Sequence, residues 1–325
     1  MDDGRVTSVT HMDGIFAASV TDGDAATGCT VVVCPRGATA GVDVRGGAPA
    51  TRETDLLRPE ESVGVLHAVV LSGGSAYGLA AACGVAEELE RRSIGLDVGV
   101  GVVPIVSSAC LFDLGCGRAD VRPDASFGAE ATRRALCGAE EALETGNVGA
   151  GAGCTVGKLA GMGRAMKSGL GEGVSQRGAL VCGAIAAVNA VGNVIDPRSG
   201  RTIAGALSEG HDAILDVDAA MDAAAGREPL LRTNTTISCV TTNARLTKAQ
   251  ATKVAQMAAD AYAHTINPTH TPLDGDTVFV MATGEVEASV ETVGYLATGA
   301  LEQAIVSAVR DAPSAHGYPS AREFA

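Results

Sequence analysis

The stretch TNTTISCVTTNA, residues 233–244, decides the fold. Side chains of an extended chain alternate between two faces, so Ile237 and Cys239 share one face while Val240 lies on the other. The β-branched residues in this run favour a strand. The preceding letters, GREPLLR, are polar and contain a proline, which predicts a loop. The bond between Asn234 and Thr235 therefore lies where a loop enters a strand, and a threonine-rich strand edge can also be purely structural.

The composition predicts closely stacked layers. The chain has 325 residues, which is enough for one large or two small domains. Apolar residues make up 46% of it, aromatic residues only 3%, and tryptophan is absent. The core must therefore be built from Ala, Val, Leu, Ile and Gly, which let sheets and helices approach closely.

Charge and cysteine usage exclude several classes of protein. A net charge of −14 repels phosphate backbones, so no nucleic-acid partner is expected. No apolar run is long and unbroken enough to predict a membrane span, and the N-terminal residues do not resemble a signal peptide. The nine cysteines form no CxxC pair and mostly lie in apolar surroundings, which favours a reducing, cytoplasmic location.

The order of elements predicts an α/β protein. The first three strand-like runs read as an antiparallel meander, and the acidic region 208–232 reads as less ordered. Strands are expected at 14–20, 29–34, 38–47, 65–71, 99–114, 178–196, 201–207, 235–244 and 274–284. Helices are expected at 79–92, 124–143, 247–266 and 290–305. This mixture predicts two sheets packed on each other and covered by helices, a four-layer αββα sandwich in a single domain, 1–325.

Two glycine-rich segments could bind an anion. SGGSAYGLA, residues 72–80, follows a strand and opens a helix, whose first amides can hold a negative charge. GAGAGCTVGK, residues 149–158, imitates a phosphate loop, but Leu159 stands where GxxxxGK[ST] requires a hydroxyl. For both segments the alternative is close packing of a strand against a helix.

Three polar residues stand in places where they need an explanation. Asp274 and Asp276 bracket a glycine ahead of a buried strand, so both carboxylates could hold an ammonium group or polarise a hydroxyl. A calcium loop would need more oxygen ligands, and a turn with solvated carboxylates is the alternative. Asn189 lies inside an apolar strand, where an unpaired amide costs about 1–3 kcal/mol. Its amide is either structural or a donor for an oxyanion.

Signatures of metal and cofactor sites do not occur. The six histidines show neither HExxH nor another metal-ligand spacing, and there is no GxSxG nucleophile motif. We expect neither a metal nor a cofactor.

Six motifs taken in order give a resemblance to a known family. SGGSAYGL, VSSACLFDL, GAGAGCTVGK, AAVNAVGN, NTTIS and HTPLDGDTVF together resemble the L-aminopeptidase/D-esterase family, over nearly the full chain. That family includes D-stereospecific aminopeptidases, β-peptidyl aminopeptidases and the nylon-oligomer endo-hydrolase. NTTIS and DGDT form the specific pair, because each glycine-rich motif alone is weak.

The resemblance implies the αββα fold of N-terminal-nucleophile hydrolases and a precursor that cuts its own chain. The matching bond is Asn234–Thr235, which would leave fragments 1–234 and 235–325 bound to each other. The family's lysine falls on Lys158, its strand asparagine on Asn189, and its acidic pair on Asp274 and Asp276. The resemblance also implies a homo-oligomer, a tetramer of cleaved heterodimers.

The chain departs from the family pattern at two positions. Phe112 stands where some members carry a tyrosine, so any role of that phenolic hydroxyl is in doubt here. Asp274 stands where some aminopeptidase members carry a serine, which makes this chain more similar to the nylon-hydrolase type at that position.

The chemistry of a threonine at a new chain end fits the resemblance. A threonine hydroxyl needs an adjacent base, and cleavage would supply the α-amine of Thr235, whose unperturbed pKa is about 8. Thr235 would attack an amide carbonyl and Asn189 would donate to the oxyanion. Lys158 would lower the pKa of that amine or donate to the hydroxyl. Asp274 and Asp276 would orient the amine or bind a cationic substrate end.

Two alternatives stay open at this stage. An acyltransferase of the ornithine-acetyltransferase type also uses an N-terminal threonine, and a non-cleaving protein could bind small molecules through the glycine-rich loops. A denaturing gel distinguishes the non-cleaving protein from the self-cleaving enzymes. The non-cleaving protein would give one band near 32.4 kDa, and the others would give two fragments. The substrate can be a peptide, an amino-acid amide or an ω-amino-acid oligomer.

Overall fold

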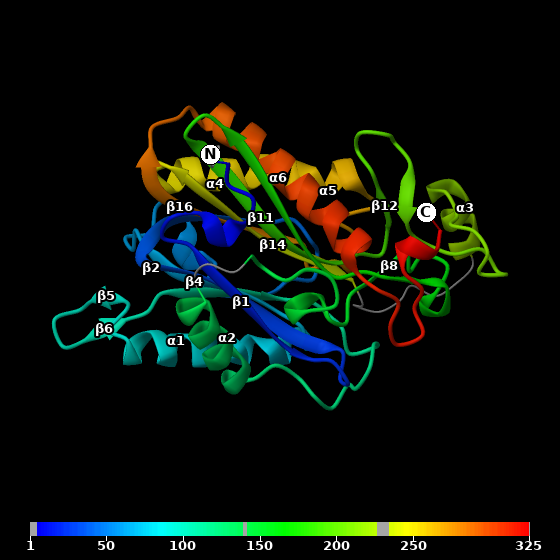
Figure 1. Ribbon diagram of the computed structural model, residues 1–325, viewed down its shortest axis with the longest axis horizontal. Helices are drawn as coiled ribbons and strands as arrows, with labels where there is room; N and C mark the ends of the chain where they lie inside the picture. The colour runs from blue at the N-terminus through cyan, green and yellow to red at the C-terminus, as the bar shows by residue number, and fades with distance from the viewer. Residues whose placement is uncertain (1–4, 139–141, 226–233, 325) are drawn as a thin grey trace.

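The computed structural model describes residues 5–138, 142–225 and 234–324. Within these ranges the chain forms two stacked sheets with helices on both outer faces (Figure 1). The expected four-layer αββα sandwich is thus confirmed. Residues 226–233, the greater part of the expected loop ahead of Thr235, lie outside the described residues.

One long strand, β2 (Thr27–Val44), joins the two sheets. Its first half pairs with β1 and β4, and its second half pairs with β16, with a register shift between Val33 and Ala38. The first sheet also contains β7 and the short edge strand β3. The bounds of its other strands are β1 (Phe16–Asp22), β3 (Ala50–Arg52), β4 (Leu66–Ser72) and β7 (Val106–Cys110).

The second sheet carries the deciding stretch at its centre. Strand β14 (Thr235–Ala244) pairs antiparallel with β11 (Leu180–Asn189) and parallel with β16 (Thr277–Val286). Strand β10 (Leu170–Arg177) forms the edge beyond β11. Because β14 has a neighbour on each side, its first residues are enclosed by both.

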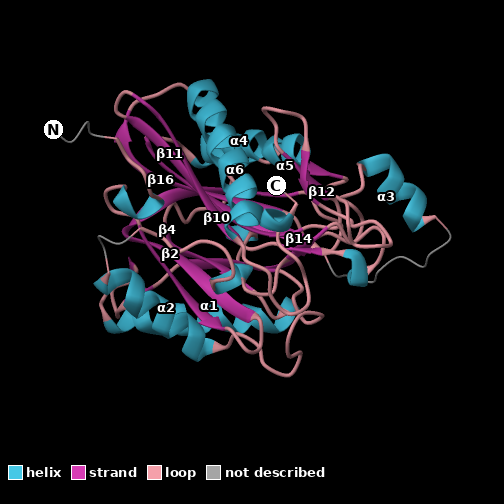
Figure 2. Ribbon diagram, turned by 45° about the vertical axis from the view of Figure 1, so that its right-hand side comes forward, coloured by secondary structure: helices cyan, strands magenta, loops and turns pink. Residues whose placement is uncertain are grey.

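The core consists of three apolar layers. Ile237 and Cys239 of β14 face the first sheet, while Val240 faces the helices, as the alternating pattern predicts. Helices α4 (Lys248–Ala258), α5 (Asp260–Thr265) and α6 (Val290–Asp311) cover the second sheet, and α1 (Ala81–Arg91) and α2 (Ala125–Cys137) cover the first (Figure 2).

Helix ends follow the capping signals in the sequence. The Thr247 hydroxyl accepts from the Gln250 amide and the Gln250 side chain accepts from the Thr247 amide, a complete capping box. Asp124 caps α2 through the amides of Ser126 and Phe127. The single helix expected over 247–266 is divided into α4 and α5 at Ala259.

Three expectations about strands and loops were wrong in detail. Residues 29–34 and 38–47 were expected as separate strands of a meander, but β2 runs continuously from Thr27 to Val44 because the register shift absorbs the PRG segment. The expected strand 178–196 is interrupted after Asn189, where the chain bends before β12 (Asn193–Ile195). The acidic region 208–232 contains helix α3 (Val217–Ala224), capped by Asp216.

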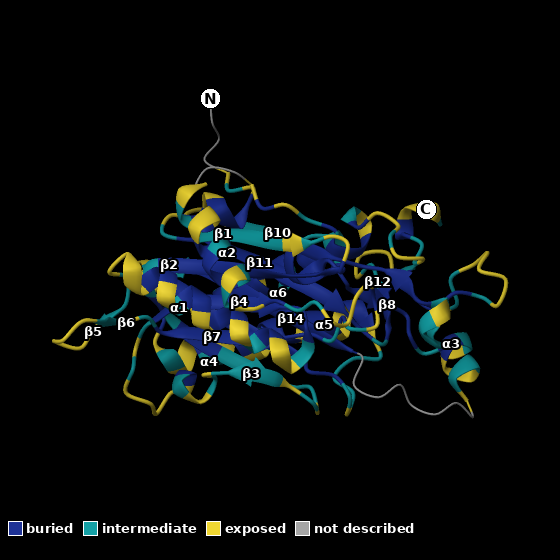
Figure 3. Cartoon of the chain, turned by 90° about the horizontal axis from the view of Figure 1, so that it is seen from below, coloured by how far each residue is buried: buried dark blue, intermediate teal, exposed yellow. Residues whose placement is uncertain are grey.

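The remaining strands are short and lie outside the two main sheets. They are β5 (Leu96–Asp97), β6 (Val102–Val103), β8 (Thr155–Val156), β9 (Met166–Lys167), β13 (Thr202–Ala204) and β15 (Ile266–Asn267). Figure 3 shows the main sheets buried in the centre, with α3 and the β5–β6 hairpin largely at the exposed periphery. No helix in the described ranges is long and apolar enough to span a bilayer.

Glycines let α6 lie directly on the edge strand β10. A Cβ added at Gly171 would stand 2.0 Å from the carbonyl oxygen of Ala304, and one at Gly173 would stand 2.2 Å from that of Ala300. Both distances are far below contact with backbone atoms that cannot rotate away. The small residues expected from the composition therefore set the spacing between helix and sheet.

We predict that Gly171→Ala lowers the free energy of unfolding by about 2 kcal/mol or more, because α6 must move to admit one methyl group. Denaturant unfolding followed by circular dichroism measures this change. Gly64→Ala is the matched control, since a Cβ there meets no atom within 4 Å. Equal midpoints for the two variants would contradict the direct contact of α6 with β10.

Candidate active site

Thr235 begins β14 and is buried, with 5% of its surface exposed. The register places it directly opposite Asn189, the last residue of β11. Its hydroxyl donates to the carbonyl oxygen of Asn234 and accepts from the amide of Gly275, at 3.1 Å for the latter contact. The hydroxyl thus lies against the carbonyl of its own preceding peptide bond.

Asn189 and Lys158 are directly connected. The Lys158 Nζ donates to the carbonyl oxygen of Asn189 at 2.9 Å and to its Oδ1 at 2.7 Å. The amide of Thr155 donates to the same Oδ1 at 3.1 Å. Asn189 Nδ2 donates to the backbone oxygen of Phe112 at 2.8 Å, so the buried amide is paired as its position in an apolar strand requires.

The Lys158 side chain is among the largest that are fully buried. Burial lowers the pKa of Lys158 from its ordinary 10.5 to about 7, although Cys154 and Asp274 act in the opposite direction. A substantial fraction of this amine is therefore neutral at neutral pH. Such an amine can accept a proton as well as donate one.

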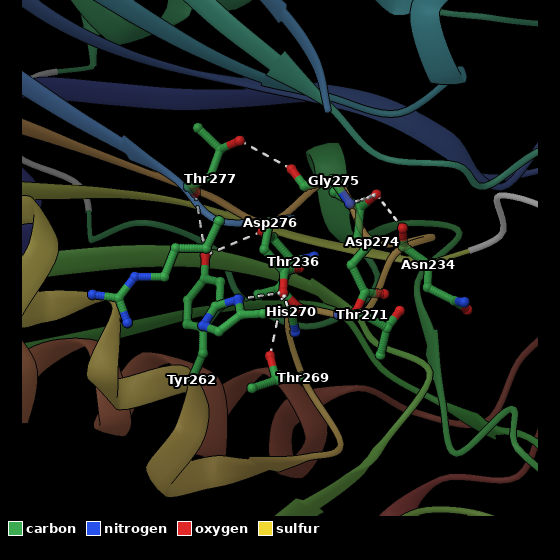
Figure 4. A network of polar contacts seen from close by, with 12 residues as sticks. Asn234, Thr236, Tyr262, Thr269, His270, Thr271, Asp274, Gly275, Asp276 and Thr277 are labelled. Atoms are coloured by element: carbon green, nitrogen blue, oxygen red, sulfur yellow. Dashed lines mark hydrogen bonds and ion pairs between the residues drawn. The ribbon is translucent and has the colours of Figure 1, made fainter. Parts of the chain in front are cut away.

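Asp274 and Asp276 lie beside the first residues of β14, on the side of this strand that is opposite to β11 and Asn189. Asn234 forms a parallel bridge with Asp274, and the amide of Thr236 donates to Asp276 Oδ1 at 2.8 Å (Figure 4). Both carboxyls are nearly inaccessible to solvent, so the alternative reading of a turn with solvated carboxylates does not hold. The Gly275 between them supplies the amide that contacts the Thr235 hydroxyl.

Hydrogen bonds are shared unequally between these two carboxyls. Asp276 Oδ2 is contacted by the Thr269 hydroxyl at 3.2 Å, the His270 amide at 3.1 Å and the His270 Nδ1 at 2.9 Å. Asp274 Oδ2 accepts from the Thr271 amide at 2.6 Å, but Oδ1 has no hydrogen-bond partner within the described ranges. Burial, followed by the charge of Asp276, raises the pKa of Asp274 to about 6.

The two glycine-rich segments do not form anion cradles. The Gly74 amide, in the segment SGGSAYGLA, donates to Asp113 Oδ1 at 2.7 Å, so a carboxylate of the chain itself already occupies this turn. In the second segment the amides of Gly149 and Ala150 donate to the hydroxyls of Thr21 and Thr30. Both segments serve close packing, and the second leads into β8 and Lys158.

The structure brings all five residues expected from the sequence into one site. Thr235 pairs with Asn189 in the ladder between β14 and β11, and Lys158 donates a hydrogen bond to Asn189. Asp274 pairs with Asn234 and Asp276 accepts from Thr236, the residues on either side of Thr235. Sequence reasoning gave no role to His270 or to the Gly275 amide, although both lie in the quoted motif HTPLDGDTVF.

A small cavity beside Lys158, lined in part by Cys116 and Met162, was also not foreseen from the sequence. A larger groove between β10 and α6 contains none of the five residues.

Comparison with known proteins identifies the family. The model of Peptidase family S58 matches residues 6–322, and the chain belongs to that family. It is therefore a hydrolase, and the family resemblance read from the motifs is confirmed.

Characterised and uncharacterised relatives cover most of the chain. It is 40% identical to an uncharacterized aminopeptidase of Mycobacterium leprae (strain TN), over 91% of this chain and 85% of the relative. It is 42% identical to an uncharacterized aminopeptidase of Mycobacterium tuberculosis (strain ATCC 25618 / H37Rv), over 92% and 90%. It is 30% identical to the 6-aminohexanoate-oligomer endohydrolase of Kocuria sp. (strain KY2), over 87% and 77%.

Solved structures agree with the fold. The L-aminopeptidase D-Ala-esterase/amidase from Ochrobactrum anthropi superposes with a TM-score of 0.67 at 17% identity, covering 94% of this chain and 86% of the other. A Burkholderia sp. beta-aminopeptidase gives 0.65 at 19% identity, covering 94% and 87%. The first is described as a variant of the Ntn hydrolase fold, and this class of fold is the one expected from the motifs.

We predict that the neutral, buried amine of Lys158 makes stability depend on pH. Between pH 7 and 10 the unfolded chain keeps the proton that the folded chain has lost, so the free energy of unfolding rises with pH, by up to about 1.4 kcal/mol per pH unit. Comparing urea unfolding of the parent with Lys158→Met isolates this contribution, because the variant cannot titrate there. Lys253→Met, on the exposed side of α4, is the control that should keep the parental slope. A constant difference between the parent and Lys158→Met over this range would contradict a neutral Lys158.

Proposed function

We propose that the chain is a self-processing amide hydrolase in which Thr235 is the nucleophile. The observation that carries the proposal is the position of the Thr235 hydroxyl, which is buried, hydrogen-bonded to the Asn234 carbonyl oxygen and contacted by the Gly275 amide. A nucleophile that is already held against a carbonyl loses little further conformational freedom when it attacks. This lowers the barrier to attack.

Self-cleavage would begin in the intact chain. The Thr235 Oγ attacks the Asn234 carbonyl carbon, the peptide C–N bond breaks, and the nitrogen takes up a proton as the chain becomes an ester at Oγ. Water then hydrolyses the ester, leaving the Asn234 carboxylate and the free amine and hydroxyl of Thr235. The products are fragments 1–234 and 235–325, which would stay associated because β14 pairs with β11 and β16 pairs with β2, and each pairing joins the two fragments.

The new terminus would then act on substrates. The Thr235 amine takes the hydroxyl proton as Oγ attacks the substrate carbonyl, and passes it to the departing amine. The resulting acyl-enzyme is released by water. Asn189, at the opposing position of the ladder, would donate through its amide nitrogen to the developing oxyanion. Lys158, held by Asn189, would donate to the hydroxyl or lower the pKa of the amine.

The acidic pair would have separate tasks. Asp276 holds the backbone that follows the nucleophile, through the Thr236 amide. Asp274 keeps an oxygen that contacts no described donor, and this oxygen would bind the Thr235 ammonium or the amine of a substrate. Above pH 6 the Asp274 carboxyl is mostly ionised, which suits a cationic partner.

The substrates proposed are peptides, amino-acid amides or ω-amino-acid oligomers. The aminopeptidase and oligomer-endohydrolase names of the relatives support amide substrates of this kind. A panel of L- and D-amino-acid amides, β-peptides and 6-aminohexanoate oligomers, with hydroxylamine as a competing acceptor, distinguishes these classes and separates hydrolysis from acyl transfer. We also propose an assembly of cleaved heterodimers, which size-exclusion chromatography with light scattering would measure.

We predict that Thr235→Ala stays as a single chain of 32.4 kDa and has no measurable amidase activity, because it lacks the attacking oxygen. Thr235→Ser should still be processed and active. Intact mass spectrometry and amide hydrolysis by the same preparations test both statements. A Thr235→Ala protein that splits between Asn234 and Thr235, or that hydrolyses amides at the parental rate, would refute the proposal.

A further inference from the structure

His270 contacts Asp276, one member of the acidic pair, but has no role in the proposed reaction described above. It lies in the loop between β15 and β16, and its ring Nδ1 stands 2.9 Å from Asp276 Oδ2. Its own amide donates to the same oxygen at 3.1 Å. The residue therefore contacts one carboxylate oxygen twice, from the backbone and from the ring.

The backbone of His270 is held in an unfavourable conformation. Its φ is +55°, in the left-handed region that non-glycine residues rarely adopt. Such a conformation persists where the surroundings determine it, and it commonly occurs at functional sites. Here the double contact with Asp276 fixes the conformation and aims the ring at the carboxylate.

The other faces of the ring are also fixed. It stacks on Tyr262, with ring centroids 5.5 Å apart and planes inclined by 24°. The Tyr262 hydroxyl lies 2.8 Å from Ser238 Oγ, and its single proton points toward the carbonyl oxygens of Thr236 and Thr277, at 3.1 and 3.2 Å (Figure 4). These contacts hold the phenol in place beside the His270 ring. His270 Nε2 is buried and has no hydrogen-bond partner in the described ranges. A carboxylate accepts only, so Nδ1 carries the proton and donates to Asp276.

A continuous chain of contacts therefore leads from His270 to the nucleophile. His270 donates to Asp276, Asp276 accepts the amide of Thr236, and Thr236 directly follows Thr235. Burial and, second, the charge of Asp276 raise the pKa of Asp274, so His270 is connected through Asp276 to both members of the acidic pair.

We propose that His270 is a positioning residue of the reaction, which keeps the Asp276 carboxylate aimed at the Thr236 amide and so fixes the backbone beside the nucleophile. This inference rests on the proposed function, because it acts through the residue that follows Thr235. The charged and titratable groups around it are Asp274, the Tyr262 phenol of α5, Asp43 of β2 behind that phenol, and Lys158 near Asp274.

Two substitutions separate positioning from packing. His270→Gly removes the ring donor without backbone strain at positive φ. His270→Asn keeps a donor near the position of Nδ1 in a residue that tolerates this conformation. We expect His270→Gly to lower kcat about tenfold with little change in KM, the effect expected from one charge-assisted hydrogen bond. We expect His270→Asn to recover most of the lost kcat, because its amide restores a donor to Asp276.

His211→Gly is the matched control, since that histidine also has a positive φ, of +58°, but is exposed. Rates are expressed per processed active site, from intact mass data, so that loss of folded protein does not count as loss of catalysis. A His270→Gly protein with the parental kcat, or a His270→Asn protein no better than His270→Gly, would overturn the inference. Failure of the proposed function itself would be recognised separately, by a Thr235→Ala protein that remains active.

Discussion

The site depends on the double pairing of β14. One neighbour, β11, runs antiparallel and ends at Asn189, opposite the first residue of β14, while the other, β16, runs parallel and begins just after Asp276. One strand end and two strand starts therefore meet at Thr235. A shift of β11 by one residue would turn Asn189 to the other face of the sheet, so the register that buries the core also assembles the polar residues.

This arrangement explains how polar groups are tolerated at the centre of a four-layer fold. A buried amide, ammonium or carboxyl is costly unless its hydrogen bonds are satisfied. Lys158 reaches two oxygens of Asn189, and Asp276 receives donors from four groups, so both are accommodated. Asp274 is the exception, because one of its oxygens lacks a described donor and its pKa is raised. Buried carboxyls with raised pKa values cluster at functional sites, and Asp274 has this character.

Much of this could be predicted from the sequence, for identifiable physical reasons. Alternation in β14 and the capping box of α4 are local signals, and both were read correctly. The continuity of β2 through PRG was missed because a register shift is set by the partner strands and not by the local residues. The pairing of Lys158 with Asn189 joins segments distant in the chain, so only the family resemblance could anticipate it. His270 was overlooked because its contact with Asp276 depends on a left-handed backbone that the sequence does not signal.

The two aspartates accept different numbers of hydrogen bonds, and this difference affects how a threonine terminus could operate. A free α-amine must be neutral to accept the hydroxyl proton, yet it must be held in place by an anion. Two fixed carboxylates would favour the ammonium form too strongly, because each opposite charge raises the pKa of an amine. Because Asp276 is committed to backbone and ring donors, only Asp274 would hold the amine in the processed chain that we propose, and burial raises the pKa of that carboxyl. This division of hydrogen bonds would therefore limit how strongly the acidic pair favours the ammonium form.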